Sequence, residues 1–355
     1  MQSEKINPWI CFIVHFLIEV ICFTTVLHLS NHNVGYAVLI AVIYDMLAFY
    51  PQFLIGLIHE RFKKLNISLI SGIIMLIGVI LFQYQASFTQ NIVAVIFIAL
   101  GNAFLHDCCA IQTTLIGKGT LFPTALFVGA GSFGVAVGTY LSGFEVPKYC
   151  LLIMMALIIV LMLLTNSSWI REDYEYARFN IISQKHIDKK MVIIITAFFV
   201  TTVRSYMSYA IPISWKKETW QMFLLFFMMG LGKIVGGFLA DRIGPYKTGV
   251  FSAIFSIPFL VFGDNLMTVS IIGVFLFSFT MSITYGMFLS VFNDNPGFAF
   301  GLTTLALGFG SLLPAFISGF GKLGDILIVI VFSLISAICM ERMLDSNVVL
   351  KGGEK

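Results

Sequence analysis

The chain has 355 residues, of which 59% are hydrophobic, 15% are aromatic and only 11% are charged, with a formal net charge of +3. Soluble globular domains carry about 25% charged and 45–50% apolar residues, so this composition excludes a soluble globular protein. The net charge is small, and no basic run is interleaved with aromatic residues, which argues against a nucleic-acid partner. The solvent for most of this chain is therefore lipid.

Apolar segments bounded by Asn, Gly, Pro or charged clusters follow one another along the whole sequence. They fall at about 8–29, 34–58, 66–86, 91–115, 121–143 and 149–168, and then at 191–213, 219–240, 248–263, 267–292, 298–320 and 326–340. A helix needs about 20 apolar residues to cross a bilayer. We therefore predict an all-α membrane protein with twelve transmembrane helices in two six-helix halves, residues 1–168 and 191–355. The polar stretch 169–190 is expected to link them.

The basic residues predict the orientation of these helices. With the amino terminus inside, fifteen of the 21 Lys and Arg residues fall in inner segments, and the outer loops hold only Lys148, Lys216, Lys217 and Lys322. Cytoplasmic loops carry the excess of basic residues. We expect a multi-pass protein of the cell (plasma) membrane, taken as a bacterial inner membrane, with both termini in the cytoplasm. The first apolar segment is longer than a signal-peptide core and is expected to be retained.

A repeated motif relates the two halves. The second segment ends in Gly56-Leu-Ile-His-Glu60-Arg61, and the eighth ends in Gly237-Phe-Leu-Ala-Asp241-Arg242, which is a shift of 181 residues. The same shift brings other loops of the two halves into register without a large gap. The halves are therefore expected to be copies with the same orientation.

These features resemble the major facilitator superfamily of secondary transporters, whose signature Gly-x-x-x-Asp-Arg-x-Gly lies between helices two and three. The second half matches at Gly237, Asp241, Arg242 and Gly244, and the first half has Glu60 in place of Asp. More narrowly, His15-Phe-Leu-Ile-Glu19 and Gly101-Asn102-Ala-Phe-Leu-His106 are similar to the fosmidomycin-resistance transporters. That branch has Asp at the place of Glu19 and a glycine run at Cys108 and Cys109.

The resemblance implies two halves that rock about a midplane site, with helices one, four, seven and ten lining the central cavity. It also implies that the repeated motif forms a gate at the inner mouth. The expected gating residues are Gly56, Glu60, Arg61, Lys233, Gly237, Asp241 and Arg242. The alternative for this motif is a solvated loop with positive-inside residues, which does not explain an acidic residue before Arg in both halves.

Ionisable residues inside a membrane span are rare and usually functional. Glu19 and Asp45 each lie about 16 Å from one end of their predicted helix, near the midplane. His15 and Glu19 are four residues apart and so share a helix face. We predict proton coupling through Glu19, assisted by His15 and Asp45. The alternative is a His–Glu hydrogen bond that only holds the first helix to a neighbour, and a structural role for Asp45 also stays open.

Arg204, on the seventh segment, has a planar fork that suits carboxylate or phosphonate groups. It is predicted either to anchor an anionic substrate opposite Glu19 or to form a permanent ion pair with Glu19 or Asp45. Asn102, His106 and Asp107 on the fourth segment are further candidates for substrate binding. No metal site is expected, because neither His106-Asp-Cys-Cys109 nor the polar face of the first segment brings four ligands together within one helix. No cofactor is expected either.

The function predicted from this reasoning is secondary active transport, with proton-coupled export of a small polar or anionic compound placed first. Proton-coupled uptake of a small metabolite is the alternative, and a membrane receptor or scaffold without transport is the alternative from another class. We expect no enzyme. The expected partners are membrane lipid, a small-molecule substrate and protons, with no protein partner evident.

Overall fold

The computed structural model describes residues 8–62, 65–164, 179–317 and 319–350. Within these ranges the chain is helical, and its only extended pairing is an isolated bridge between Ile182 and Leu344. The helices of the first half are α1 (Pro8–His32), η2 (Val34–Tyr36), α2 (Ala37–Phe49), α3 (Gln52–Arg61), α4 (Ile67–Leu81), α5 (Phe88–Gly117), α6 (Phe122–Leu141) and α7 (Lys148–Leu164). Those of the second half are α9 (Lys190–Ala210), α10 (Thr219–Ile243), α11 (Pro245–Phe262), α12 (Met267–Phe277), α13 (Thr280–Val291), α14 (Pro296–Phe316) and α15 (Gly321–Met343).

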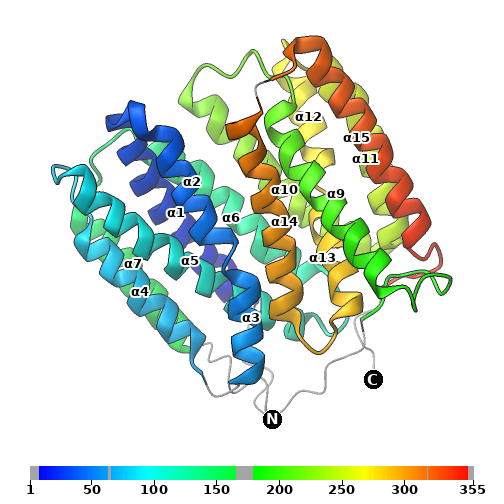
Figure 1. Cartoon of the computed structure of the whole chain (residues 1–355), viewed down its shortest axis with the longest axis horizontal. Helices are drawn as coiled ribbons and strands as arrows, with labels where there is room; N and C mark the ends of the chain where they lie inside the picture. The colour runs from blue at the N-terminus through cyan, green and yellow to red at the C-terminus, as the bar shows by residue number, and fades with distance from the viewer. Residues whose placement is uncertain (1–7, 63–64, 165–178, 318, 351–355) are drawn as a thin grey trace.

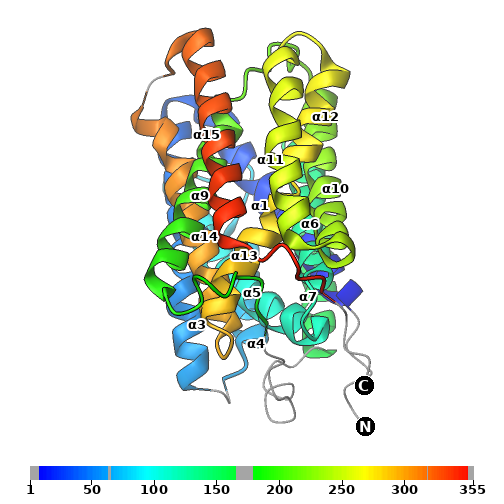
Figure 2. The same ribbon diagram turned by 90° about the vertical axis from the view of Figure 1, so that its right-hand side faces the viewer.

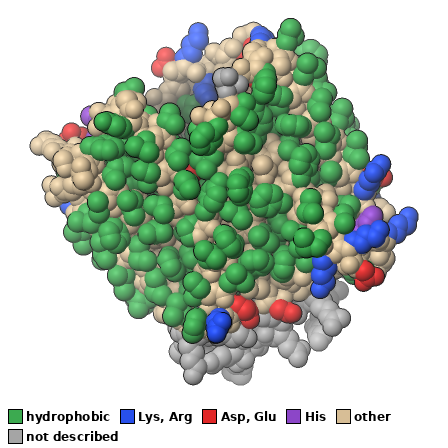
Figure 3. All heavy atoms as spheres, viewed as in Figure 1, with side chains coloured by type: hydrophobic (Ala, Val, Ile, Leu, Met, Phe, Trp, Pro, Cys, Tyr) green, Lys and Arg blue, Asp and Glu red, His purple; other side chains and the backbone are tan. Residues whose placement is uncertain are grey.

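These helices account for all twelve predicted membrane spans. Ten helical segments are long and apolar enough to cross a membrane, and α4 and α7 are shorter apolar helices at the two remaining places. The predicted all-α membrane fold is confirmed. Charged residues gather around the edges of the molecule in Figure 3, while hydrophobic side chains cover the face between them, as expected for a surface in contact with lipid.

Two of the spans are broken in the middle, which the sequence analysis did not predict. The second span divides into α2 and α3 at Pro51, where proline has no N–H to donate and crowds the preceding turn. The tenth span divides into α12 and α13 at Ser278, whose hydroxyl donates to the carbonyl of Val274, 2.8 Å away. Such back-bonding competes with the helical ladder and bends helices. Both breaks lie in spans that line the interior of the bundle.

The two halves lie side by side, with α1–α7 in one bundle and α9–α15 in the other (Figure 1). They meet along two extensive helix pairs, α6 with α10 and α3 with α14. The shift of 181 residues carries α3 onto the end of α10 and α6 onto α14, so the two contacts are equivalent under the repeat. The interface between the halves is therefore pseudo-symmetric, as the repeated motif implied.

Helix α15 lies on the outside of the second bundle, in front of α9 and beside α11 (Figure 2). Along one side it exposes Leu323, Leu327, Val331, Leu334 and Ile338. Apolar side chains in such number are stable in lipid and would aggregate in water. This helix is the twelfth predicted span.

The predicted linker begins at residue 169, and residues 165–178 lie outside the described part of the chain. Its second portion packs against the second half. The backbone N–H of Phe179 donates to Asn293 Oδ1 (2.6 Å), and that of Ile181 donates to Ser290 Oγ (3.1 Å). Residues from Phe179 onwards are thus anchored to the end of α13.

We call the end of the bundle where α1 begins and α15 ends the inner end, in keeping with the predicted orientation, and the opposite end the outer end. At the outer end, the loop residue Asp264 accepts from the N–H and the hydroxyl of Ser214 and pairs with Lys322. These partners hold the pKa of Asp264 below its ordinary value of 3.8, the Lys322 ammonium being the largest cause.

Candidate functional site

A cavity of about 180 Å³ lies between the two halves. Its wall is formed by α1, α2, α5 and α6 of the first half and by α10, α13 and α14 of the second. Charged and polar side chains from both halves face it. They are His15, Glu19, Tyr44, Asp45, Asn102, His106, Ser132, Lys233 and Thr304. Buried ionisable groups are costly in a membrane, so their concentration at one cavity marks this place as the candidate site.

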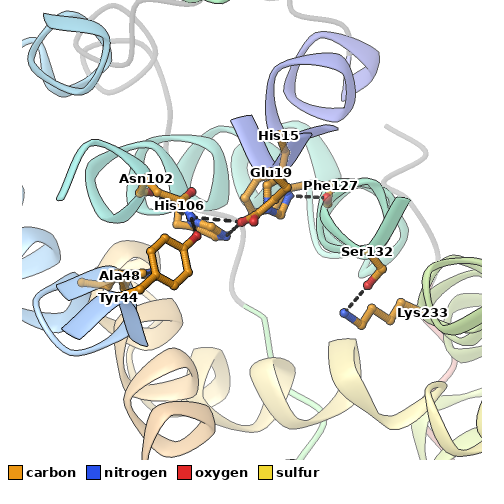
Figure 4. Close-up of polar contacts among 10 residues, drawn as sticks. His15, Glu19, Tyr44, Ala48, Asn102, His106, Phe127, Ser132 and Lys233 are labelled. Atoms are coloured by element: carbon orange, nitrogen blue, oxygen red, sulfur yellow. Dashed lines mark hydrogen bonds and ion pairs between the residues drawn. The ribbon is translucent and has the colours of Figure 1, made fainter. Parts of the chain in front are cut away.

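Glu19 is at the centre of the polar contacts (Figure 4). Its Oε1 accepts a hydrogen bond from Asn102 Nδ2 at 3.0 Å. The Nε2 atoms of His15 and His106 lie 3.5 and 3.7 Å from the same oxygen. The other carboxylate oxygen, Oε2, is buried without a hydrogen-bond partner. One carboxylate on the first span is therefore joined to a second helix, α5, that is distant in sequence.

The two imidazole rings are held in fixed orientations. Nδ1 of His15 lies 2.7 Å from the carbonyl oxygen of Phe127, and Nδ1 of His106 lies 2.9 Å from that of Asn102. A carbonyl only accepts, so each Nδ1 carries the hydrogen, and in the neutral ring Nε2 keeps its lone pair. A side chain at Gly131 would fill the space of the His15 ring, since its Cβ would lie 2.5 Å from Nε2.

Asn102 connects three spans of the first half. Besides Glu19 on α1, its amide nitrogen contacts the hydroxyl of Tyr44 on α2 at 2.9 Å. Tyr44 is 5% exposed, so this contact is shielded from water. Because the amide itself belongs to α5, it fixes the relative positions of the helices that form the first half's side of the cavity.

Two of the polar contacts that join one half to the other at the cavity involve a charged side chain. Ser311 of α14 donates to Asp45 Oδ2 of α2 at 3.0 Å. Lys233 of α10 donates to Ser132 Oγ of α6 at 2.7 Å. Lys233 was predicted to make a structural or gating contact, and its ammonium lies at the central cavity. Both contacts must change when the halves move relative to one another.

Arg204 does not lie where the sequence analysis expected it. It belongs to a separate small pocket of the second half, lined also by Ala253, Phe277, Ser336 and Met340. Its Nη1 contacts the sulfur of Met281 at 2.8 Å, and its Nε has no hydrogen-bond partner. Among the described residues no carboxylate pairs with Arg204. Arg204 therefore does not face Glu19 across the cavity, whereas its neighbour Met281 lines it.

The predicted substrate residues of α5 divide between two faces. Asn102 and His106 line the cavity, whereas Asp107 points away from it. Successive helical residues diverge by about 100°. Asp107 is fully buried towards the inner end, where its Oδ2 lies 3.6 Å from Nδ1 of His59 on α3. This second His–carboxylate pair joins α3 to α5 within the first half.

The repeated motif lies at the interface between the halves at the inner end. A Cβ on Gly56 would lie 2.5 Å from the carbonyl carbon of Gly297, and one on Gly237 would overlap the Cβ of Ala125. Asp241 accepts from the backbone N–H groups of Leu121 and Phe122 at 2.8 and 2.9 Å. This carboxylate of the second half therefore caps the first turn of α6 in the first half.

The remaining motif residues are less enclosed. Arg61 and Arg242 are exposed at the inner end, and the guanidinium of Arg242 lies 5.2 Å from the ring centroid of Phe238. Glu60 is half-buried at the end of α3. Among the described contacts of the motif, glycine packing and the Asp241 cap join the two halves at the inner end.

Four residues of the site escaped the sequence analysis. Tyr44, Phe127, Ser132 and Ser311 contribute a hydroxyl or a carbonyl oxygen from three different helices, α2, α6 and α14. A tyrosine one position before a predicted intramembrane Asp was a usable signal. The carbonyl of Phe127 gave no signal in the sequence, because every residue has a backbone carbonyl. The two serines gave none either, since serine is frequent in packed membrane helices.

No protein-family model matches this sequence, and no curated protein sequence matches it. Solved structures are similar in fold. The human organic anion transporter MFSD10 (TETRAN) aligns with a TM-score of 0.69 and 14% identity, over 96% of this chain and 100% of that one. FucP, a major facilitator superfamily transporter, in the outward conformation aligns with a TM-score of 0.59 and 16% identity, over 95% and 99% of the two chains. A variant of the E. coli fucose:proton symporter FucP gives 0.60 and 15%, with 95% and 99% covered. At these identities the likeness shows that this chain shares the fold of these proteins.

Proposed function

We propose that this protein is a secondary active transporter of the major facilitator superfamily that moves a small polar solute through the cavity between its halves. The observation that supports this most directly is the cavity itself. It is enclosed by helices of both halves and lined by acidic, basic, imidazole and amide side chains, namely His15, Glu19, Asp45, Asn102, His106 and Lys233. A scaffold has no need of buried charges at such a place.

The proposed transport cycle is alternating access by rocking of the halves. At the inner end the halves are in close contact at two places. Gly56 of α3 packs against the backbone of α14, and Asp241 of α10 caps the start of α6. For access to move to that side, these contacts have to separate. The pseudo-symmetric pairs α3–α14 and α6–α10 supply two equivalent surfaces along which such a motion can occur.

We propose the proton as the coupling ion, with Glu19, His15 and Asp45 as the residues that carry it. Glu19 and Asp45 are carboxylates on the cavity wall, and Asp45 is also bonded to the opposite half through Ser311. A proton on Asp45 changes that contact and so the relation of the halves. Export is placed first, and uptake remains the alternative.

The choice of substrate differs from the first expectation. An anionic group was favoured because of Arg204, which lies outside the cavity. The cation on the cavity wall is Lys233, and it faces the same space as Glu19 and Asp45. The proposed substrate is accordingly a small polar solute that contacts both acidic and basic side chains of the cavity wall.

Transport is tested in proteoliposomes that contain a trapped pH indicator. A panel of anionic, cationic and zwitterionic solutes is added in turn, and the internal pH is followed. We expect a subset of solutes to drive proton movement. The direction of the internal pH change distinguishes antiport from symport. Glu19→Gln should abolish that movement.

The matched control is Glu145→Gln, which removes an exposed carboxylate in the outer loop between α6 and α7. This variant should transport as the wild type does. Solute-driven proton movement that persists in a well-folded Glu19→Gln protein, or a complete lack of it in the wild type, would contradict proton-coupled transport.

A further inference from the structure

The histidines on the cavity wall converge on one carboxylate from two different helices. His15 and Glu19 belong to α1, and His106 belongs to α5. One nitrogen or oxygen atom from each of the three lies within 4.8 Å of the others. The side chains are 3%, 6% and 7% exposed, respectively. Figure 4 shows His15 and His106 directed towards the Glu19 carboxylate from opposite sides.

The three atoms that meet are electron-pair donors. Both Nδ1 atoms are engaged with backbone carbonyls, so both neutral rings present the lone pair of Nε2 to the carboxylate. Asn102 supplies a single N–H to Glu19 Oε1, and Oε2 is buried without a partner. Lone pairs repel one another in a buried site, so this arrangement is stable only with a positive species among them.

The geometry suits a metal ion. Zinc binds imidazole nitrogen and carboxylate oxygen at about 2.0–2.2 Å, so its ligand atoms lie about 3.3–3.8 Å from one another at angles of 109–120°. The observed separations from Glu19 Oε1 are 3.5 Å to His15 Nε2 and 3.7 Å to His106 Nε2. The carbonyls of Phe127 and Asn102 hold the rings as outer-shell partners usually hold ligating histidines.

The donor set selects the class of ion. Two imidazoles and one carboxylate suit divalent first-row transition metals. Ca²⁺ prefers six to eight oxygen ligands, and Mg²⁺ demands an octahedral oxygen shell. Three protein ligands leave a coordination position for water or a solute, and all three ligands lie on the cavity wall.

We propose that His15, Glu19 and His106 form a binding site for a divalent transition-metal ion of the zinc type, reached from the central cavity. This inference goes beyond the proposed transport function and does not depend on it, because it concerns binding to the purified protein. A metal site was not expected from the sequence, since the search within single helices could not bring His106 to α1.

The surroundings define how binding depends on pH. The other titratable or charged groups that face the three ligands are Cys22 on α1, Tyr44 and Asp45 on α2, and Lys233 on α10. Histidine must lose its proton to ligate a metal, so protons compete with the ion. Binding should therefore weaken as the pH is lowered, and the ammonium of Lys233 opposes the ion at every pH at which it is charged.

The proposal is tested with the full chain in detergent, freed of metal by a chelator and titrated with Co²⁺ at about pH 7.5, where histidine of ordinary pKa is neutral. We expect a single Co²⁺ per chain with the visible absorption of a nitrogen- and oxygen-ligated ion. Zn²⁺ should displace it, and Mg²⁺ and Ca²⁺ should not. Failure of the wild type to bind Co²⁺ or Zn²⁺ would overturn the proposal and leave the proton as the cation at this place.

Three variants identify the site. His15→Gln, Glu19→Gln and His106→Gln should each lower the metal affinity by about tenfold or more. Loss of an outer-shell partner already costs about tenfold, and loss of a ligand should cost at least as much. The matched control is His32→Gln, which removes an exposed histidine stacked on His28 at the outer end of α1. Binding that survives all three variants, or that disappears in His32→Gln, would place the ion elsewhere.

A second measurement needs no variant and so does not depend on their folding. X-ray absorption at the metal edge of the wild-type complex should give two imidazole ligands together with oxygen ligands. A sulfur ligand would contradict the assignment, because the buried cysteines nearest in sequence are outside the proposed set, namely Cys11 and Cys22 on α1 and Cys108 and Cys109 on α5.

Discussion

Replacing Gly56 by alanine should drive the inner end of the protein open. Gly56 lies against the backbone of α14, and a Cβ there would lie 2.5 Å from the carbonyl carbon of Gly297. Carbon atoms in contact prefer about 3.5–4.0 Å, so α3 and α14 must separate by about 1 Å or more. Backbone atoms cannot rotate aside as a flexible side chain can.

The size of the effect follows from the cost of overpacking. An extra methyl group in a closely packed interface costs about 1–3 kcal/mol, and that amount shifts a two-state equilibrium by about 5–150-fold. Alanine is the better helix former by about 1 kcal/mol, so the substitution does not weaken α3 itself. The penalty therefore falls on the closed contact between the halves.

The assay uses a cysteine in place of Ser132 on the cavity wall. Its reaction with a membrane-impermeant maleimide is measured in oriented vesicles, from the inner side and from the outer side. In Gly56→Ala the rate of labelling from the inner side should rise by about 5–150-fold. Gly237→Ala should raise the same rate, because its Cβ would overlap that of Ala125. Gly35→Ala is the matched control, since nothing lies within 4 Å of the added carbon.

The reasoning would be refuted by an unchanged inner rate in a folded Gly56→Ala protein. It would equally be refuted if Gly35→Ala raised the rate as much, because the effect would then be unrelated to the contact between α3 and α14.

Three further predictions concern polar contacts. Asp241→Asn loses one charge-assisted bond to the start of α6, worth about 1.5–3 kcal/mol, and should raise inner-side maleimide labelling as the glycine variant does. Asp264 has a pKa held below 3.8 by Lys322, so its stabilisation is complete above that pH and disappears as the pH falls through the lower folded-state value. Thermal unfolding at the acid end should show this loss in the wild type, and Asp264→Asn should not show it. Lys233→Met removes a buried ammonium bonded to Ser132. Because burying a charge costs free energy, the variant should keep or raise the melting temperature. It should also abolish solute-driven proton movement. A lower melting temperature would show that this contact stabilises the fold.

Much of the fold was predictable because lipid imposes a simple rule on sequence. Each span has to be apolar for its whole length and helical throughout, so the twelve segments and their order were evident from hydropathy. The breaks at Pro51 and Ser278 were not predicted. A proline inside a membrane helix is tolerated when neighbours satisfy the freed carbonyls, and sequence alone does not reveal those neighbours.

The candidate site was predictable in part. Glu19, His15, Asp45, Asn102 and His106 were selected because polar side chains in a membrane are rare, and the structure places all five on one cavity wall. Their partners depend on which helices are adjacent. The approach of His106 to Glu19 requires α5 to lie against α1, 83 or more residues away in sequence, and no local pattern encodes that contact.

Arg204 illustrates the opposite case. Arg204 is buried, but the sequence did not determine its direction around the helix, and it points into the second half rather than into the cavity. A rotation about the helix axis leaves the hydropathy of a span unchanged. Only packing against α13 and α15 fixes it.

The central claim, that the halves rock about the cavity, is tested most directly by measuring distances between spin labels across the interface at both ends. One pair replaces Phe62 and Lys247 at the inner end, and the other replaces Val34 and Leu323 at the outer end, all four exposed. The half-exposed Cys150 and Cys339 are replaced beforehand, and the remaining four cysteines are buried. In Gly56→Ala the inner distance should lengthen while the outer distance shortens, relative to the wild type. Distances that stay the same at both ends, or that change in the same direction, would contradict alternating access in this protein.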